Sequence, residues 1–288
     1  MTLPLLAGVS EIADQYDALI LDLWGVVHNG VEPYPGVLDC MAKLHEAGKK
    51  VVLLSNAPRQ SDKVKDQVAG FGVPREAYDV LVTSGDVTRL HVQRRDDDWH
   101  AALGQKYFHV GPDRDHGLLH GTGVDEVKDM ADADFVLTSG LYDDEVDTEA
   151  DYDEIFAKAR SRNLPMICAN PDLSVMRGTK MVLCAGSIAA HYEKMGGEVR
   201  YNGKPYPPGY ELCFERLGGI EKSRIIGVGD SFRTDIAGAN NVGIASLFVL
   251  SGIHAEELGG DQQDAVKIEA AAIKAGHMPT AAVAGFYW

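Results

Sequence analysis

Residues 18–27 read ALILDLWGVV, and this stretch decides the fold. Its first seven residues are apolar except for one carboxylate, Asp22, which is typical of a strand buried in a parallel sheet. A loop that contains glycine then leads to Pro35-Gly36. The stretch therefore predicts a buried strand, over residues 18–24, that carries an acid near its carboxyl end.

Helices and strands alternate after this first strand. Leu38, Met41 and Leu44 recur at intervals of three residues, and Gly48 follows, so we expect a helix over residues 36–46. The following segments predict strands at 50–55 and 80–83 and helices at 61–71 and 84–94. This order is typical of an α/β domain with a parallel sheet.

A second α/β series begins after an Asp-rich turn at residues 96–98. It contains predicted strands at 106–110, 135–138 and 166–169 and a predicted helix at 152–159. The opening pattern then resumes, with a strand at 224–229, a helix at 234–240 and a strand at 245–250. One α/β domain (residues 1–85 and 199–288) is therefore expected to be interrupted by another (residues 86–198).

Composition excludes several classes of protein. At about 150 residues per domain, 288 residues indicate two domains. Hydrophobic residues make up 45% and charged residues 24%, which excludes disordered and fibrous proteins. With 43 acidic and 27 basic residues, the net charge of −16 repels polyphosphates and anionic lipids. We expect neither a nucleic-acid partner nor a membrane partner.

The cysteines and the N-terminal residues indicate the compartment. The four cysteines lie far apart and never form a C-x-x-C pair, which argues against a disulfide framework or a zinc ribbon. Residues 1–10 contain no Lys or Arg, and their apolar stretch is short for a signal peptide. These features predict a cytoplasmic protein.

Polar residues cluster where the predicted strands end. The clusters contain Asp22, Ser55 with Asn56, Gly203-Lys204-Pro205, and Asp230 with Asp235. Ligands of open parallel sheets bind at the carboxyl ends of the strands. Each residue alone has a commoner explanation, such as a helix cap, a surface charge or a turn. Their order and placement favour phosphoryl transfer, which needs a nucleophile, positive charge and aligned donors.

Four segments occur in the order of the motifs of a known superfamily. They are DLWGVV (22–27), LSNA (54–57), GKP (203–205) and GVGDSFRTDIAG (227–238). Together with ANPD (169–172), they resemble the haloacid dehalogenase superfamily, specifically its class IIA phosphatases. The resemblance implies an α/β fold in which a doubly wound, Rossmann-like parallel sheet core carries an inserted α/β cap of the C2 type.

The resemblance also implies a nucleophile and a metal site. Asp22 would attack phosphorus and form an aspartyl-phosphate. The carboxylates of Asp22 and Asp230 and the backbone carbonyl of Trp24 would hold Mg²⁺. The expected metal ligands thus come from two motifs that lie far apart in the sequence.

The same resemblance assigns the phosphate contacts. Lys204 would balance the charge of Asp22 and of the phosphoryl oxygens, to which the Ser55 hydroxyl and the Asn56 backbone N–H would donate. Asp235 would lie behind the metal ligands. Lys204 and Ser55 are therefore expected to assist the reaction as well as to bind phosphate.

Position 24 departs from the phosphatase pattern D-x-D, whose second Asp protonates the leaving oxygen. The indole N–H of Trp24 is no usable acid at neutral pH, and general acid catalysis is worth about 10²- to 10⁴-fold. Two routes remain open, a different acid or a leaving group that departs unprotonated. His28, with an ordinary pKa of about 6.5, is the nearest candidate acid in the sequence.

These observations predict a Mg²⁺-dependent phosphoester hydrolase that acts on a small phosphorylated metabolite such as a sugar phosphate. The main alternative is a noncatalytic phosphometabolite sensor in which Trp24 packs on the bound ligand. Dehalogenation ranks third. Haloacid dehalogenases carry an aromatic residue at this position, but Asp230, the G-K-P motif and the large cap point to a phosphate substrate. The sequence leaves substrate identity and oligomeric state open, a homodimer included.

Overall fold

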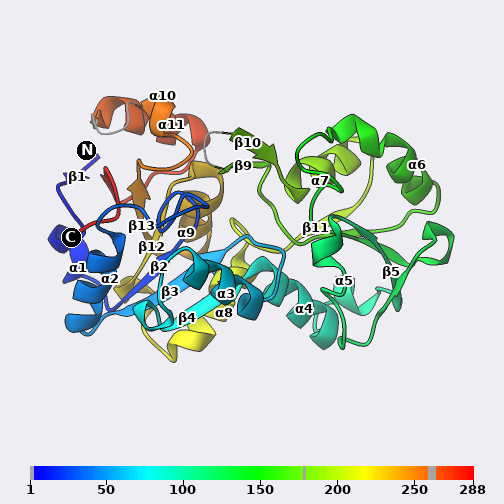
Figure 1. Ribbon diagram of the computed structural model, residues 1–288, viewed down its shortest axis with the longest axis horizontal. Coiled ribbons are helices and arrows are strands. Elements are labelled where there is room, and N and C mark those ends of the chain that lie inside the picture. The colour runs from blue at the N-terminus through cyan, green and yellow to red at the C-terminus, as the bar shows by residue number, and fades with distance from the viewer. Residues whose placement is uncertain (1–2, 178–179, 259–263) are drawn as a thin grey trace.

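The computed structural model describes residues 3–177, 180–258 and 264–288. It contains two α/β bodies that lie side by side along its long axis (Figure 1). The core is built on a sheet whose strands fall within residues 5–83 and 225–283, and it contains both termini. The cap is built on a second sheet whose strands fall within residues 106–201.

The core sheet has seven strands, all parallel, in the order β1-β14-β13-β12-β2-β3-β4. Their bounds are β1 Leu5–Leu6, β2 Ala18–Leu21, β3 Lys50–Ser55, β4 Val80–Thr83, β12 Ile225–Gly229, β13 Ala245–Val249 and β14 Ala281–Val283. The chain runs outward from β2 to β3 and β4, then returns to fill the other side with β12, β13 and β14. The switch point therefore lies between β2 and β12, where ligands bind in such sheets.

Helices cover both faces of the core sheet because successive side chains of a strand point to opposite faces. Leu19 and Leu21 of β2 belong to a hydrophobic cluster with α2 and α3, whereas Ala18 and Ile20 belong to a cluster with α4, α8 and α9. The helices of the core are α1 Ser10–Ala13, α2 Val37–Glu46, α3 Ser61–Gly70, α4 Ser84–Arg94, α8 Pro207–Leu217, α9 Ala237–Val242, α10 Ala255–Leu258 and α11 Ala265–Ala275. Short turns of 3₁₀ helix occur at Arg75–Ala77 and Lys222–Arg224, and a π-helical turn at Phe232–Ile236.

The cap sheet has five parallel strands in the order β11-β8-β7-β5-β6. Their bounds are β5 Lys106–Val110, β6 Asp125–Val127, β7 Phe135–Thr138, β8 Met166–Cys168 and β11 Val199–Tyr201. The cap helices are α5 Asp98–Ala101, α6 Asp153–Ser161 and α7 Ala185–Lys194, with 3₁₀ turns at Asp113–Asp115, Met130–Asp132 and Glu149–Tyr152.

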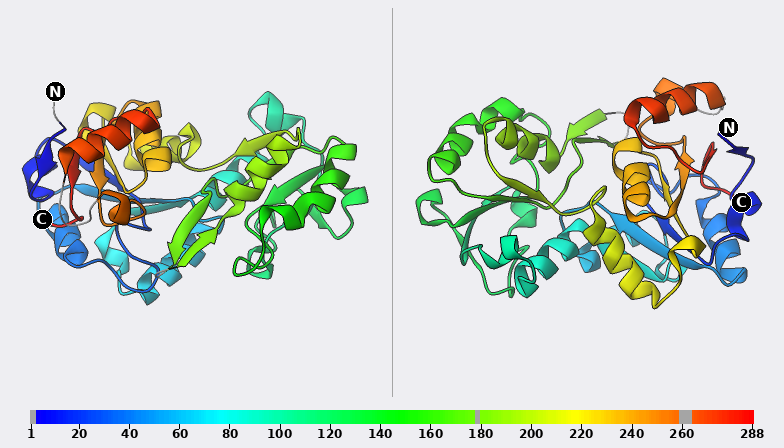
Figure 2. Two further views of the ribbon diagram at one scale, coloured as in Figure 1. Left: turned by 90° about the horizontal axis from the view of Figure 1, so that it is seen from above. Right: turned by 180° about the vertical axis from the view of Figure 1, so that it is seen from behind.

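An antiparallel hairpin also extends from the cap. Its strands are β9 Ser174–Arg177 and β10 Lys180–Leu183. The hairpin lies between the core and the cap in both views of Figure 2. This position lets its side chains reach the carboxyl edge of the core sheet, as described below.

The predicted fold class is confirmed, and the strands expected at 50–55, 80–83, 106–110 and 135–138 coincide with β3, β4, β5 and β7. The first strand ends at Leu21 instead of residue 24, because Gly25 adopts a left-handed φ of 82° and the N–H groups of Val27 and His28 both donate to the Leu23 carbonyl. The chain thus turns away from the sheet directly after Asp22.

Two other expectations need correction. The inserted segment was expected to end at residue 198, but β11 at Val199–Tyr201 pairs with β8 and extends the cap sheet by one more strand. The helix expected at 234–240 begins as the π-helical turn, because the N–H groups of Asp235 and Ile236 both donate to the Ser231 carbonyl. Among the described residues, no helix is both long and apolar enough to cross a membrane.

Replacement of Leu19 by Ala should destabilise the core markedly. Leu19 is 1% exposed in the central strand, so Leu19→Ala leaves a cavity and should lower the free energy of unfolding by about 2–5 kcal/mol. Leu38→Ala on α2 is the matched control, because Leu38 is 37% exposed and should lose less than about 1 kcal/mol. Urea unfolding measures both, and equal losses would contradict the assigned strand.

Candidate active site

Adjacent strands bring two acids together at the switch point. The Asp22 N–H donates to the Val228 carbonyl at 2.9 Å, so Asp22 and Asp230 leave the sheet at the same edge. Asp235 joins them, and one oxygen from each carboxylate lies within 4.8 Å of the others. Burial raises the pKa of Asp22 well above its usual range, and burial with the nearby charge of Asp235 raises the pKa of Asp230 to about 7. The cluster is a site that favours a cation.

Backbone encloses the Asp230 carboxylate. The Ile253 N–H donates to its Oδ2 at 2.7 Å, and the Ser251 hydroxyl donates to the Gly25 carbonyl at 2.8 Å. A Cβ atom would lie 2.0 Å from this carboxylate at Gly25 and 1.8 Å from it at Gly252. Glycine is therefore required at both positions by the close approach of backbone to carboxylate.

Lys204 lies between two of the acids. Its side chain is buried, and its Nζ donates to Asp22 Oδ1 at 2.5 Å and to Asp235 Oδ1 at 2.7 Å. Burial alone lowers the pKa of Lys204, but the two carboxylates outweigh it and hold that pKa well above the ordinary value. The Ser231 N–H donates to the other Asp235 oxygen at 3.1 Å, which orients this carboxylate toward the ammonium.

Asn56 holds the backbone of Lys204 in place. Its Oδ1 accepts from the Lys204 N–H at 2.7 Å, and its Nδ2 donates to the Lys204 carbonyl at 3.2 Å. The neighbouring Ser55 hydroxyl accepts from the Ala57 N–H at 3.2 Å. Ser55 is the last residue of β3 and Asn56 follows it, so β3 delivers both residues to the edge where Asp22 lies.

The ANPD segment joins the cap to this network. The Asp172 carboxylate accepts from Asn56 Nδ2 at 2.9 Å, and Arg233 donates to the Pro171 carbonyl at 3.1 Å. Burial raises the pKa of Asp172. The segment therefore contacts core residues directly at the junction of the two bodies.

Trp24 lies beside the acids and packs within its own loop. Its indole meets the His28 ring edge-on, with ring centroids 5.2 Å apart. Gly30 lies so close that a Cβ atom there would be 2.4 Å from the indole. The indole thus occupies the space that a side chain at position 30 would need.

His28 is poorly suited to donate a proton. Its ring is 1% exposed and packs against Phe71, and its Nδ1 accepts from the Gly30 N–H at 3.0 Å. Burial lowers the pKa of His28 to about 4, so only about one imidazole in a thousand is protonated at pH 7. These observations argue against the expected catalytic role, and His28 instead supports Trp24.

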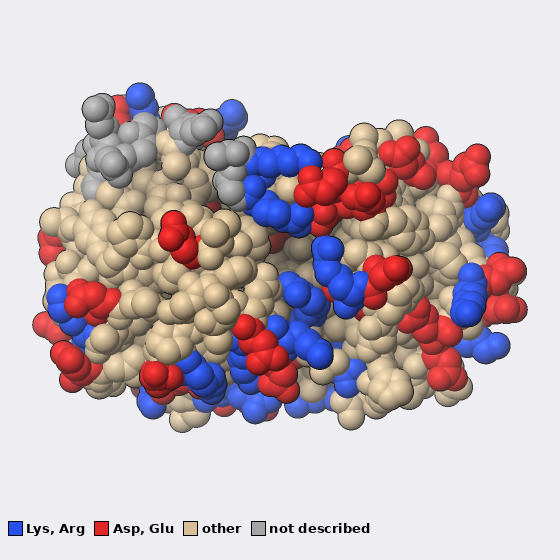
Figure 3. All heavy atoms as spheres, viewed as in Figure 1, with Lys and Arg blue, Asp and Glu red and all other residues tan. Residues whose placement is uncertain are grey.

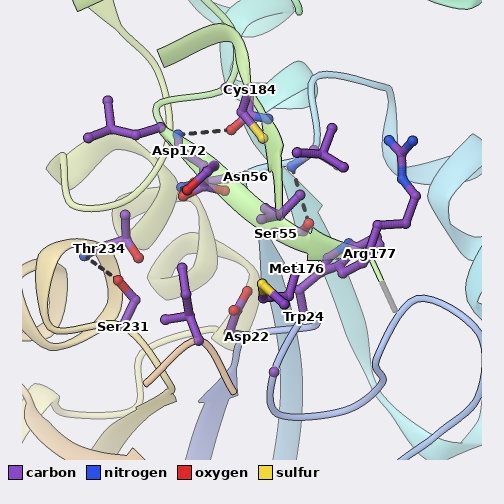
Figure 4. A pocket seen from close by; sticks show the side chains of 18 of the residues that line it. Asp22, Trp24, Ser55, Asn56, Asp172, Met176, Arg177, Cys184, Ser231 and Thr234 are labelled. Carbon is purple, nitrogen blue, oxygen red and sulfur yellow. Dashed lines mark hydrogen bonds between the residues drawn. The ribbon is translucent and has the colours of Figure 1, made fainter. Parts of the chain in front are cut away.

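A cavity of about 530 Å³ lies over the acids, between the core and the cap. Asp22, Trp24 and Ser55 line it from the core, whereas Met176 and Arg177 line it from the hairpin (Figure 4). Asn56, Lys204 and Asp230 also belong to its wall. The structure therefore brings together the expected residues of all four motifs, together with side chains from the cap.

Comparison with known proteins identifies the family. A model of haloacid dehalogenase-like hydrolases matches residues 19–125, and a second model of similar hydrolases matches residues 201–274. A solved structure, a hydrolase of the haloacid dehalogenase-like family from Brucella suis 1330, is 36% identical with a TM-score of 0.84, and the alignment covers 98% of this chain and 99% of that one. The chain belongs to the haloacid dehalogenase-like hydrolases.

Named members of this hydrolase family are more distant. The D-glycerol 3-phosphate phosphatase of Mycobacterium tuberculosis is 26% identical over 85% of this chain and 66% of its own length. A crystal structure of the glycerol phosphate phosphatase from that organism in complex with magnesium is 25% identical, with a TM-score of 0.67 over 92% of this chain and 75% of its own. These similarities extend over both the core and the cap.

Sequence reasoning missed two parts of this hydrolase site. One is the loop after β13, where Ser251, Gly252 and Ile253 enclose Asp230. A Ser-Gly pair at the end of a predicted strand was a usable signal. The other is the hairpin with Met176 and Arg177, whose strands show no clear alternation and which only tertiary packing brings to the cavity.

Replacement of Lys204 by Met should destabilise the protein in a way that depends on pH. Lys204→Met leaves the buried carboxylates of Asp22 and Asp235 without their cation, which should lower the free energy of unfolding by about 3–5 kcal/mol at pH 8. The raised pKa of Asp22 should rise further, so protonation relieves the repulsion as the pH falls, and the loss should be smaller at pH 5. Urea unfolding in EDTA at both pH values measures the difference.

Lys50→Met is the control for this comparison, because Lys50 pairs with Asp79 on the surface and its side chain is 56% exposed. An exposed pair contributes little to stability, because solvent and salt screen the two charges. If the loss in Lys204→Met is the same at pH 5 and pH 8, the buried ion pair is not the source of the effect.

Proposed function

We propose that the protein is a Mg²⁺-dependent phosphatase that acts on a small phosphorylated metabolite through an aspartyl-phosphate on Asp22. The observation that carries this proposal is the buried ammonium of Lys204, held between Asp22 and Asp235 beside Asp230 at the floor of a cavity. Such an arrangement of nucleophile, cation and acids suits phosphoryl transfer. The named phosphatase relatives support it.

The acidic cluster has the chemistry of a magnesium site. Three carboxylates converge there, and oxygen ligands are those that Mg²⁺ prefers. Burial, together with the neighbouring carboxylates, raises the pKa values of Asp22 and Asp230. We propose that Asp22, Asp230 and the Trp24 carbonyl hold the ion. When bound, Mg²⁺ would offset the charge of the carboxylates and of the phosphoryl oxygens.

The remaining steps belong to side chains of the chain itself. An Asp22 oxygen attacks phosphorus while the bond to the leaving oxygen breaks, and water later hydrolyses the aspartyl-phosphate. Lys204 stabilises the charge of the phosphoryl oxygens, and the Ser55 hydroxyl and the Asn56 N–H donate to them. Asp235 acts through Lys204, whose ammonium it orients.

Loss of the nucleophile should abolish turnover. Asp22→Asn is nearly isosteric but a far weaker nucleophile, so release of inorganic phosphate from a panel of phosphate esters should fall by about 10³-fold or more. EDTA should abolish activity and added Mg²⁺ should restore it. The control is Asp39→Asn, because the Asp39 side chain is 62% exposed on α2 and should not affect turnover. Full activity of Asp22→Asn would refute the mechanism.

Trp24 favours one alternative to catalysis. No acid occupies position 24, and the buried, largely unprotonated His28 does not replace it. A protein that binds Mg²⁺ and a phosphorylated metabolite without hydrolysing it is therefore the second candidate function. The phosphatase and the noncatalytic binding protein predict different effects of an acid at position 24 on hydrolysis.

Restoration of the acid separates catalysis from sensing. If the missing acid limits turnover, Trp24→Asp should raise hydrolysis of alkyl phosphates by about 10-fold or more but change that of p-nitrophenyl phosphate little, because the latter leaving group barely needs a proton. Trp24→Phe is the control, since it removes the indole without supplying an acid. No gain in a folded, Mg²⁺-binding Trp24→Asp variant would favour the sensor.

A further inference from the structure

Basic side chains line the cavity beside its acids, although the chain as a whole is acidic. The net charge is −16, yet Lys and Arg side chains cluster over the junction between core and cap (Figure 3). Four arginines line the same cavity as Asp22, namely Arg59, Arg114, Arg177 and Arg233. A site of about 530 Å³ also has room for more than a phosphoryl group. We therefore expect the leaving group of the substrate to lie in this space, where the arginines can contact it.

Three of the four arginines already have carboxylate partners, and the partner of Arg233 is Asp172 at 3.7 Å. Arg177 binds Asp144 through both terminal nitrogens, at 3.1 and 2.8 Å, and also reaches Glu145 at 3.1 Å. Arg114 binds Asp144 at 3.1 Å. These pairs fix the positions of Arg114 and Arg177 at the cap side of the cavity.

Arg59 differs, because among the described residues no carboxylate lies within 4 Å of its guanidinium. Its only side-chain hydrogen-bond partner within residues 3–177, 180–258 and 264–288 is the neutral Gln67, whose Oε1 accepts from Arg59 at 2.6 Å. Burial and the charge of Arg114 lower its pKa against the opposing effect of Asp115. A partly buried guanidinium beside a second one is an arrangement that an anion stabilises.

The charge of Asp115 offsets that of Arg59 only in part, since the pKa of Arg59 remains lowered. Burial raises the pKa of Asp115, and its Oδ1 has no hydrogen-bond partner among the described residues. Ser139, whose hydroxyl lies 2.8 Å from His109 Nε2, lines the cavity beside it. Arg59 itself follows Ser55 and Asn56 in one loop, so the phosphate site and the arginine share a wall of the cavity.

We propose that the leaving group carries a second anionic group, a carboxylate or a further phosphate, and that Arg59 binds it with Arg114 alongside. This inference rests on the proposed function, because it assumes that the phosphoryl group lies at Asp22. A planar guanidinium can donate two parallel hydrogen bonds to a carboxylate or to a phosphate. A neutral hydroxyl group on the ligand cannot accept both of these bonds. The protein would thus select phosphate esters whose leaving group carries an anion over esters of similar size whose leaving group is neutral.

Matched pairs of ligands test this selection without turnover. The Asp22→Asn protein with Mg²⁺ is titrated by calorimetry with glycerol 3-phosphate against 3-phosphoglycerate, and with 1,3-propanediol monophosphate against the bisphosphate. The more highly charged member of at least one pair should bind at least about 10-fold more tightly, as expected for a charge-assisted contact. The pair that responds tells whether a carboxylate or a phosphate is recognised.

Further variants assign the preference to Arg59. In the same background, Arg59→Met should reduce the ratio of affinities within the responding pair to near one, and Arg59→Lys should restore part of it. Arg75→Met should keep the ratio, since Arg75 donates to the Tyr78 carbonyl outside the cavity wall. A general loss of structure would weaken both ligands alike and leave the ratio unchanged.

The outcomes separate the two proposals. No preference within either pair, or a preference that survives in a folded Arg59→Met variant, overturns the anion subsite. A preference that depends on Arg59, in a protein that hydrolyses none of these esters when Asp22 is intact, supports the subsite and refutes the phosphatase. Hydrolysis of the esters without any preference refutes the subsite alone.

Discussion

The contact between the Lys204 ammonium and two buried carboxylates is the interaction on which the site depends. Asp22 follows the central strand, Asp235 belongs to the turn after β12, and Lys204 lies between them on the loop that returns from the cap. Buried charges interact strongly but are costly when unpaired. The three segments must therefore come together in the fold, because otherwise a buried charge would be left unpaired. Because Asn56 binds the Lys204 backbone on both sides, the ammonium is held where both acids can reach it.

Close packing of backbone fixes the other acid. Gly25 and Gly252 approach Asp230 so closely that neither position has room for a side chain, and the Ile253 N–H holds one oxygen. A carboxylate enclosed in this way cannot reorient, and burial together with the charge of Asp235 raises its pKa although the Ile253 hydrogen bond lowers it. The same rigidity would favour a bound cation, because little reorganisation is needed when the ion arrives.

Trp24 changes how the cavity is used. Where related phosphatases are expected to place an acid, this chain places an indole that packs on His28 and approaches Gly30 closely. The loop has thereby gained an apolar cluster and lost a proton donor. Under the proposed mechanism the chemistry of the leaving group then matters more, and the anion subsite proposed at Arg59, in the core loop after β3, would select that group.

The sequence by itself determined the fold class, the interruption of one α/β domain by another, and the set of motif residues at the carboxyl ends of β2, β3 and β12. These follow from local signals, because a buried strand has a characteristic apolar run and its end is marked by polar residues and glycine. The departure at Trp24 was visible only through the resemblance to the phosphatase pattern D-x-D.

Only the tertiary structure decided which groups meet and what charge they carry. Burial and neighbours set the low pKa of His28 and the high pKa of Asp230, and neither can be read from adjacent residues. The strand β11 joined the cap sheet, the hairpin reached the cavity, and Arg59 was left without an acid within 4 Å among the described residues, all through contacts between segments far apart in the chain. Distances between such segments and the dielectric around each group arise from packing, which local sequence patterns do not encode.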